Sequence, residues 1–263
     1  MIDAWDPAQY DKFRREREQP FRDLLELIVA RTGMRVVDLG CGTGTLTRVL
    51  HEQLQARETV GIDRSDRMLA AAAAGPPAAG LHFEAGAIES FAAAPASAPA
   101  WDIIFSNAAL HWIDDHERLI PRLAALLTPT GQLAFQIPAQ HDTLTHRIAH
   151  EVAGLEPFAS ALSGWVRSQP VLTPEGYAQV LHRCGFIDPK VRLIVYPHIL
   201  AGREEAVEWV KGTLLTDYQR HLPVHLYDRF VDLYRERLLT RLEDTMPFFY
   251  PFKRILCWGR RSA

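Results

Sequence analysis

Short apolar runs alternate along the first half of the chain with stretches whose apolar residues recur at helical spacing. Their β-branched and aromatic residues predict strands at 36–39, 59–62, 81–86, 101–107 and 132–138. Apolar residues three and four positions apart predict helices at 46–54, 66–74 and 116–127. Alternation of this kind predicts an α/β fold built on a parallel sheet.

The second half of the chain continues with helices and two further strand-like runs. Thr173 and Pro174 are typical of a helix start, and Gly185 is typical of a helix stop. Strand-like residues follow at 190–198 and 254–260, and about fifty residues with helical periodicity separate these two runs.

The first predicted strand runs directly into a glycine-rich loop, "VVDLGCGTGT" at residues 36–45. Gly40, Gly42 and Gly44 allow close approaches that a Cβ would block, so a ligand is expected to contact the main chain there. The loop joins the end of a strand to the start of a helix, which is where open α/β sheets bind ligands. The alternative is a tight turn without a ligand, in which Asp38 caps the loop amides.

The spacing of the glycines argues against a dinucleotide. The dinucleotide fingerprint G-x-G-x-x-G requires a third glycine at the position of Thr45, whereas this chain has Gly44. Asp63 ends the second predicted strand about twenty residues beyond the glycines, at the distance where an acidic residue accepts both hydroxyls of a ribose. The pattern therefore favours a nucleoside-containing cofactor other than NAD.

The motif D-x-G-x-G-x-G resembles the first motif of S-adenosylmethionine (SAM) dependent methyltransferases. The resemblance implies that the loop backbone and Asp38 hold the amino-acid end of SAM. It also implies that Ser65 and Met68 belong to the turn and helix near the adenine. For Met68, a place in the core of an amphipathic helix is an equal alternative.

The segment after the fourth predicted strand, "SNAALHWIDDHERL" at residues 106–119, lies where this family places its substrate. Asn107 is followed by two alanines, so the Asn/Asp-Pro-Pro-aromatic signature of amino methyltransferases is absent. His111 and Trp112 are candidates to border the sulfonium, and His111 is also a candidate general base. Purely structural roles for both side chains remain an equal alternative.

Over its whole length the chain is similar to the trans-aconitate 2-methyltransferase family. The similarity rests on an N-terminal pattern, on internal segments and on a terminal Phe-x-Arg segment: "WDPAQYDKFRREREQP", "NAALHWIDDH", "LAFQIP", "VEWVKGT" and "PFKRILCWGRR". It implies a Rossmann-like seven-stranded sheet, mostly parallel with the last strand antiparallel. One departure is Ala87, at a position where the family usually has an acidic residue for the adenine amino group. Backbone groups near Ala87 and Ile88 are then expected to hold the adenine.

Length and composition predict one methyltransferase domain over residues 1–263 with helical lid elements. A second independent domain is the weaker alternative, because the insertion between the last two strands returns the chain to the sheet. The expected lid segments are residues 1–32, 139–170 and 200–248. A lid over a carboxylic acid calls for cationic and hydroxyl side chains, and Tyr10, Arg17 and Arg254 are the candidates.

The composition of the chain argues against nucleic acid and membranes as binding partners. A net charge of −3 gives no broad basic surface for nucleic acid or membranes, and no apolar segment has the length of a membrane span. Three cysteines without paired spacing predict a reduced, cytoplasmic protein without a metal site. Cys41, inside the glycine loop, is expected to be a small filler.

These features together predict a SAM-dependent O-methyltransferase that esterifies a small carboxylic acid of the trans-aconitate kind. The alternatives are another O-methyl acceptor, such as a malonyl carrier protein or a phenol, and a non-enzymatic SAM-binding regulator.

Overall fold

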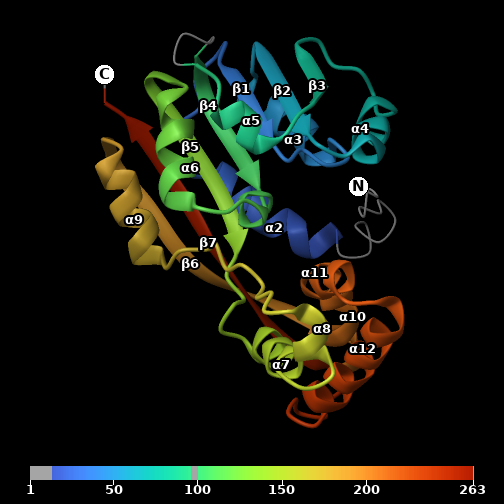
Figure 1. Cartoon of the computed structure of the whole chain (residues 1–263). Coiled ribbons are helices and arrows are strands. Elements are labelled where there is room, and N and C mark those ends of the chain that lie inside the picture. Colours follow the sequence, from blue (N-terminus) through green and yellow to red (C-terminus); the bar gives the residue numbers. More distant parts are fainter. Residues whose placement is uncertain (1–13, 96–99, 263) are drawn as a thin grey trace. The chain divides into compact units, whose positions relative to one another are not determined.

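The computed structural model describes residues 14–95 and 100–262, with only the backbone of residues 14–17 (Figure 1). The chain forms two compact units. Unit 1 comprises residues 1–138, 170–194 and 254–263, and unit 2 comprises residues 139–169 and 195–253.

Seven strands form one sheet, in the order β3-β2-β1-β4-β5-β7-β6. Their bounds are β1 Arg35–Leu39, β2 Glu58–Asp63, β3 Leu81–Ala85, β4 Trp101–Asn107, β5 Leu127–Pro138, β6 Phe186–Leu200 and β7 Phe248–Arg261. Strands β1 to β5 pair in parallel, and β7 runs antiparallel to β5. The predicted mostly parallel seven-stranded sheet with an antiparallel last strand is confirmed.

The central strands are continuous apolar runs because both of their faces are covered. Ile103, Ile104 and Phe105 of β4 are completely buried, as are Ala134 and Phe135 of β5. The core of unit 1 therefore lies along β1, β4 and β5, and it fixes where these strands end.

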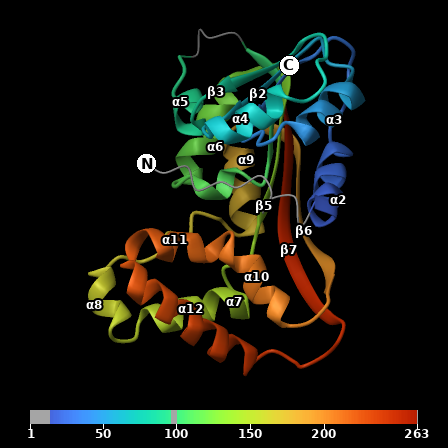
Figure 2. The ribbon, with the colours of Figure 1, turned by 90° about the vertical axis from the view of Figure 1, so that its right-hand side faces the viewer.

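The helices of unit 1 lie on both faces of the sheet. They are α2 Arg14–Leu25, α3 Thr45–Leu54, α4 Asp66–Ala73, α5 Ile88–Ala92, the 3-10 helix η1 Leu110–Trp112, α6 His116–Ala125 and α9 Pro174–Arg183. Helix α2 contacts α3, and α6 contacts both α5 and α9. Figure 2 shows these two groups on opposite sides of the sheet.

The described part of the N-terminal segment packs on the sheet. Phe21 of α2 meets Phe105 of β4 edge to face, with ring centroids 5.6 Å apart. Both backbone groups of Val29 bind the side chain of Gln132 on β5 at 2.8–2.9 Å. The lid role expected for residues 1–32 stays a prediction.

Unit 2 is mainly helical. Its helices are α7 Leu144–Ala153, α8 Phe158–Leu162, α10 Glu204–Lys211, α11 Leu214–His221 and α12 Val224–Leu239. The ring of Phe230 packs on Phe158 and on Tyr218, which joins α12 to α8 and α11. The helical periodicity predicted between the last two strands is confirmed. The single-domain organisation and the lid role of residues 139–170 and 200–248 stay predictions.

The last two strands are longer than the sequence suggested. β7 begins at Phe248, so Arg254 lies inside the strand and not at its start. The added residues alternate between buried and exposed, and Phe248, Tyr250 and Phe252 are buried. Alternating aromatic residues are typical of a half-buried strand, but the two prolines in "MPFFYPF" mask this pattern in the sequence.

Candidate active site

The glycine loop joins β1 to α3 with three residues in the left-handed region. Gly40, Gly42 and Gly44 have φ angles of +77°, +54° and +69°. A Cβ on Gly40 would lie 2.2 Å from the Cβ of Ala109, so only glycine lets the loop approach the segment after β4. A Cβ on Gly42 would meet nothing within 4 Å. The loop is therefore tight on one side and open at Gly42.

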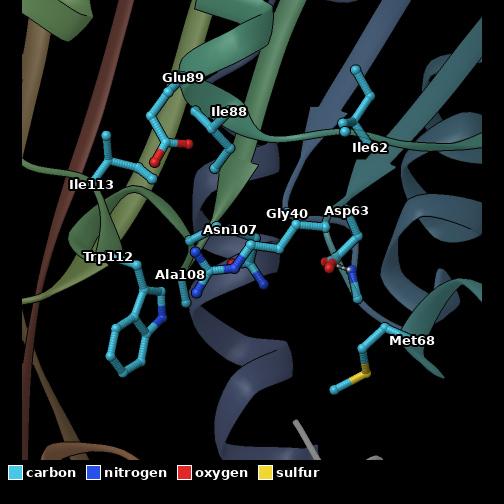
Figure 3. A pocket seen from close by; sticks show the side chains of 14 residues that line it. Gly40, Ile62, Asp63, Met68, Ile88, Glu89, Asn107, Ala108, Trp112 and Ile113 are labelled. Atoms are coloured by element: carbon cyan, nitrogen blue, oxygen red, sulfur yellow. Dashed lines mark hydrogen bonds between the residues drawn. The ribbon is translucent and has the colours of Figure 1, made fainter. Parts of the chain in front are cut away.

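A cavity opens beside this loop, with about 690 Å³ of space that includes open solvent. The walls come from the loops that follow β1, β2, β3 and β4 (Figure 3). The lining residues are Gly40, Gly42, Ile62, Asp63, Arg64, Met68, Gly86, Ile88, Glu89, Asn107, Ala108, Ala109, Trp112 and Ile113. The cavity thus lies at the carboxyl ends of the parallel strands, where α/β sheets bind ligands.

Asp63 lies at the end of β2 and supports the glycine loop. Its Oδ2 accepts a hydrogen bond from the backbone N–H of Gly42 at 2.8 Å, and its Oδ1 accepts one from the N–H of Ser65 at 2.9 Å. Each carboxylate oxygen can accept a second hydrogen bond. Asp63 therefore braces the loop and still offers acceptors to the cavity that it lines.

Asp38 lies behind the loop, where it is only 3% exposed. Its Oδ2 accepts a hydrogen bond from the hydroxyl of Thr47 at 2.6 Å. Its Oδ1 is buried without a hydrogen-bond partner among the described residues. Burial raises the pKa of Asp38 from 3.8 to about 7, and the charge of Asp63 adds to the shift, whereas the Thr47 hydroxyl opposes it. Within the described residues, the Thr47 hydroxyl is the one side-chain donor to this carboxyl group, and Oδ1 has neither a donor nor a cation beside it to stabilise its charge.

The turn after β2 leads into α4. Ser65 caps this helix, because its hydroxyl accepts a hydrogen bond from the N–H of Met68 at 3.2 Å. Met68 is buried and lines the cavity, whereas Ser65 lies behind it. Met68 is therefore both a buried residue of an amphipathic helix and part of the cavity wall. Its place near the adenine stays a prediction.

The turn after β3 supplies another part of the wall. Ala87 precedes α5, and its neighbours Gly86 and Ile88 line the cavity. Glu89 lines it too, although it was not predicted from the sequence. The sequence did contain a signal for Glu89. The family usually has an acidic residue at the position of Ala87, and this chain has one two positions later.

The segment after β4 forms the opposite wall. Asn107, Ala108 and Trp112 line the cavity (Figure 3). Ala108 has a φ of +56°, which is uncommon for a residue with a Cβ. The Oδ1 of Asn107 accepts a hydrogen bond from the side-chain amide of Gln136 on β5 at 2.6 Å. No spacing in the sequence pointed to Gln136.

A buried polar pair holds η1 in place. The carbonyl of Leu110 only accepts hydrogen bonds, so Nε2 of His116 carries the proton and Nδ1 accepts from the hydroxyl of Tyr177 at 2.5 Å. The same hydroxyl accepts from the N–H of Leu172 at 3.2 Å. Nε2 of His116 donates to the carbonyl of Leu110 at 2.9 Å. Burial lowers the pKa of His116, which keeps the ring neutral and suited to these two bonds.

His111 follows Leu110 in η1, and its ring lies 4.8 Å from that of Trp112. Trp112 lines the cavity and His111 does not. The structure therefore brings Trp112 to the cavity more directly than His111.

The three candidate substrate ligands differ in how far they are described. Tyr10 lies outside the described residues, and so does the side chain of Arg17 in α2. Arg254 is 3% exposed, and its Nη1 donates to Oε1 of Gln136 at 3.0 Å. β7 places it opposite Pro138, the last residue of β5.

Neither Cys41 nor a metal site adds chemistry among the described residues. Burial raises the pKa of the Cys41 thiol far above its ordinary value, so the thiol is neutral and a weak nucleophile. Across residues 14–95 and 100–262, no group of three or more His, Cys, Asp or Glu residues is arranged to hold a metal ion. In the same ranges, no helix combines the length and apolarity needed to cross a membrane.

Comparison with known proteins agrees with this geometry. A methyltransferase-domain family matches residues 11–187. The chain is 39% identical to trans-aconitate 2-methyltransferase of Deinococcus radiodurans, over 96% of each chain. It is 36% identical to the enzyme of the same name from Variovorax paradoxus, over 99% of this chain and 96% of that one.

The fold has a solved counterpart in the YcgJ protein of Bacillus subtilis, with a TM-score of 0.61 and 16% identity over 94% of this chain and 99% of that chain. The domain match and the full-length relatives show the family. The chain belongs to the trans-aconitate 2-methyltransferase family of SAM-dependent methyltransferases.

Proposed function

We propose that this protein transfers the methyl group of SAM to a carboxylate of a small organic acid of the trans-aconitate kind. The observation that carries the proposal is the full-length similarity to trans-aconitate 2-methyltransferases. Its three cysteines are free thiols, which supports a cytoplasmic location.

The residues around the cavity fit SAM by their chemistry. The buried, unsatisfied Oδ1 of Asp38 suits the ammonium of the methionyl end, beside Gly40, Gly42 and Gly44. The two oxygens of Asp63 suit the ribose hydroxyls. Further cofactor contacts are assigned to Ser65, Met68, Ala87, Ile88, Asn107 and Trp112.

The proposed reaction requires little acid–base chemistry. A carboxylic acid is ionised near neutral pH, so its oxygen attacks without a general base. SAM, when bound, supplies the methyl group: an O–CH₃ bond forms, the CH₃–S bond breaks, and the sulfur keeps the electron pair. The protein's task is to hold the carboxylate in line and exclude water, and such positioning supplies roughly 7–11 kcal/mol in favourable cases.

The anion of the substrate requires cationic or hydroxyl partners. We assign Tyr10, Arg17 and Arg254 to this role. Support for Arg254 comes from its place opposite the end of β5, at the edge of the sheet that carries the cavity. Arginine suits the role because its guanidinium pairs with a carboxylate through two hydrogen bonds.

A screen of acceptors tests the function. We expect labelled SAM to methylate trans-aconitate or a related di- or tricarboxylic acid, and to give a base-labile ester. Malonyl carrier protein and a phenol serve as the competing acceptors. Methylation of either one with no acid ester formed would contradict the proposal, and SAM binding without any acceptor would point to a regulator.

His111→Gln separates carboxyl methylation from chemistry that needs a base. With an ionised acceptor, the variant should keep at least about a tenth of the wild-type kcat/KM, because removing a general base costs roughly 10²–10⁴-fold. The pH profile should gain no acidic limb. His182→Gln, on the exposed side of α9, is the matched control. A thousandfold loss confined to His111→Gln would instead indicate a base and an acceptor such as a phenol.

A further inference from the structure

A line of three polar side chains crosses unit 1 from β7 to the cavity. Nη1 of Arg254 donates to Oε1 of Gln136 at 3.0 Å, and Nε2 of Gln136 donates to Oδ1 of Asn107 at 2.6 Å. Arg254 and Gln136 are 3% and 1% exposed, and Asn107 lines the cavity (Figure 3). Of these three residues, only Asn107 lines the cavity, so Arg254 and Gln136 are connected to the ligand site through Asn107.

The strand register holds the three side chains together. Gln136 is the direct neighbour of Asn107 across the β4–β5 pair. Across the β5–β7 pair Gln136 faces Leu256, and Arg254 is two residues away on the same face. The carbonyl of Gln136 also accepts the N–H of Ala108 at 2.9 Å, which holds the left-handed residue next to Asn107.

The chemistry of the three groups gives the line one direction. A guanidinium has donors and no acceptor, so the oxygen of the Gln136 amide must face Arg254. The nitrogen of that amide then faces Asn107, which must offer its own oxygen. The NH₂ group of Asn107 is left as a donor, and the structure gives it no other side-chain hydrogen bond within the described part of the chain.

We infer that Arg254 and Gln136 are positioning residues that fix the Asn107 amide, so that its NH₂ donates to a carboxylate of the bound ligand. This rests on the proposed function, which supplies two carboxylates: the methionyl carboxylate of SAM and that of the acceptor acid. A donor suits either one, whereas a reversed amide would present an oxygen and repel it. Arg254 thus acts on Asn107 through Gln136, in addition to the contact with the acid assigned to it above.

Gln136→Glu tests the direction of these hydrogen bonds while it keeps a side chain of similar size between Arg254 and Asn107. A glutamate has nearly the same shape and pairs with Arg254, but it only accepts hydrogen bonds. Asn107 must then turn its NH₂ toward Glu and its oxygen toward the cavity. We expect at least a tenfold loss of affinity for the carboxylate ligand with the melting temperature within a few degrees of wild type.

The controls separate this effect from general damage. Gln132→Glu places the same change at another buried glutamine of β5, which binds Val29 and Trp258 and does not line the cavity. It should leave ligand affinity unchanged. Asn107→Asp removes the donor itself and should weaken binding at least as much as Gln136→Glu.

Two calorimetric arms identify the carboxylate, and neither requires turnover. The first compares S-adenosylhomocysteine with methylthioadenosine, which lacks the amino-acid end, and a loss for the former alone places Asn107 on the methionyl carboxylate. The second titrates trans-aconitate into the S-adenosylhomocysteine complex, and a loss there alone places it on the acceptor. If the protein methylates no acid but shows one of these two affinity losses, the proposed reaction is wrong and the inferred role of Asn107 still stands.

Two results would overturn the inference. One is a Gln136→Glu protein whose affinities in both arms lie within twofold of wild type. The other is an equal loss for S-adenosylhomocysteine and methylthioadenosine. Arg254→Met adds a last distinction: a loss of trans-aconitate binding that Gln136→Glu does not reproduce would mean that Arg254 contacts the acid directly.

Discussion

Replacing Asp63 by alanine is expected to weaken binding of SAM and of S-adenosylhomocysteine by about 2–4 kcal/mol, the scale of hydrogen bonds lost from a charged group. The carboxylate holds the backbone of Gly42 and Ser65, and its remaining acceptors are assigned to the ribose. The variant therefore loses the proposed ribose contacts and loosens the loop at once. Titration calorimetry with S-adenosylhomocysteine gives the affinity directly.

Asp66→Ala is the matched control for Asp63→Ala. Asp66 is an exposed carboxylate in the first turn of α4, three positions away, and it does not line the cavity. Its removal should leave cofactor affinity nearly unchanged. Equal affinity in wild type and Asp63→Ala would reject the assigned role.

The same titrations should show no binding of NAD. The Gly40, Gly42, Gly44 register departs from the dinucleotide fingerprint, and the loop makes its close contact at Gly40. If the protein binds NAD and does not bind SAM, the assignment of SAM as the cofactor is wrong.

Much of the sheet could be predicted because local signals specify it. The runs ending at Leu39, Asp63 and Asn107 are buried strands. The glycines mark the turn after the first strand, and Asp63 marks the end of the second. A parallel sheet brings those three turns to one edge. The cavity lies there, and it includes Gly40, Gly42, Asp63 and Asn107, which the sequence had selected.

What escaped prediction depends on partners distant in sequence. Gln136 is one of several polar residues in an apolar run, and only the register of β5 with β4 and β7 places it between Asn107 and Arg254. The sequence pattern placed Arg254 at the start of the last strand, whereas it lies inside β7, opposite Pro138. Its burial against Gln136 could not be foreseen, because it follows from the extension of β7 back to Phe248.

Asp38 is expected to release a proton when the cofactor binds near pH 6.5. Burial holds its pKa at about 7 in the free protein, so the carboxyl group is mostly protonated at that pH. An ammonium beside Oδ1 would favour the ionised form and lower this pKa. The α-amino group of the ligand is already charged at this pH, because α-amino groups titrate above pH 7. Binding therefore expels roughly half a proton or more, and affinity rises as the pH increases from 5.5 to 7.5.

Calorimetry of S-adenosylhomocysteine at pH 6.5, in two buffers with different ionisation enthalpies, measures the released proton. Asp38→Asn keeps an oxygen for the Thr47 hydroxyl but cannot ionise, so it should release no proton and should bind about tenfold or more weakly. Thr47→Val removes the hydrogen bond that lowers the pKa of Asp38, and it should move the rise in affinity to higher pH. Equal proton release from wild type and Asp38→Asn would show that Asp38 does not hold the ammonium, and would leave the buried carboxyl group as a brace for Thr47 alone.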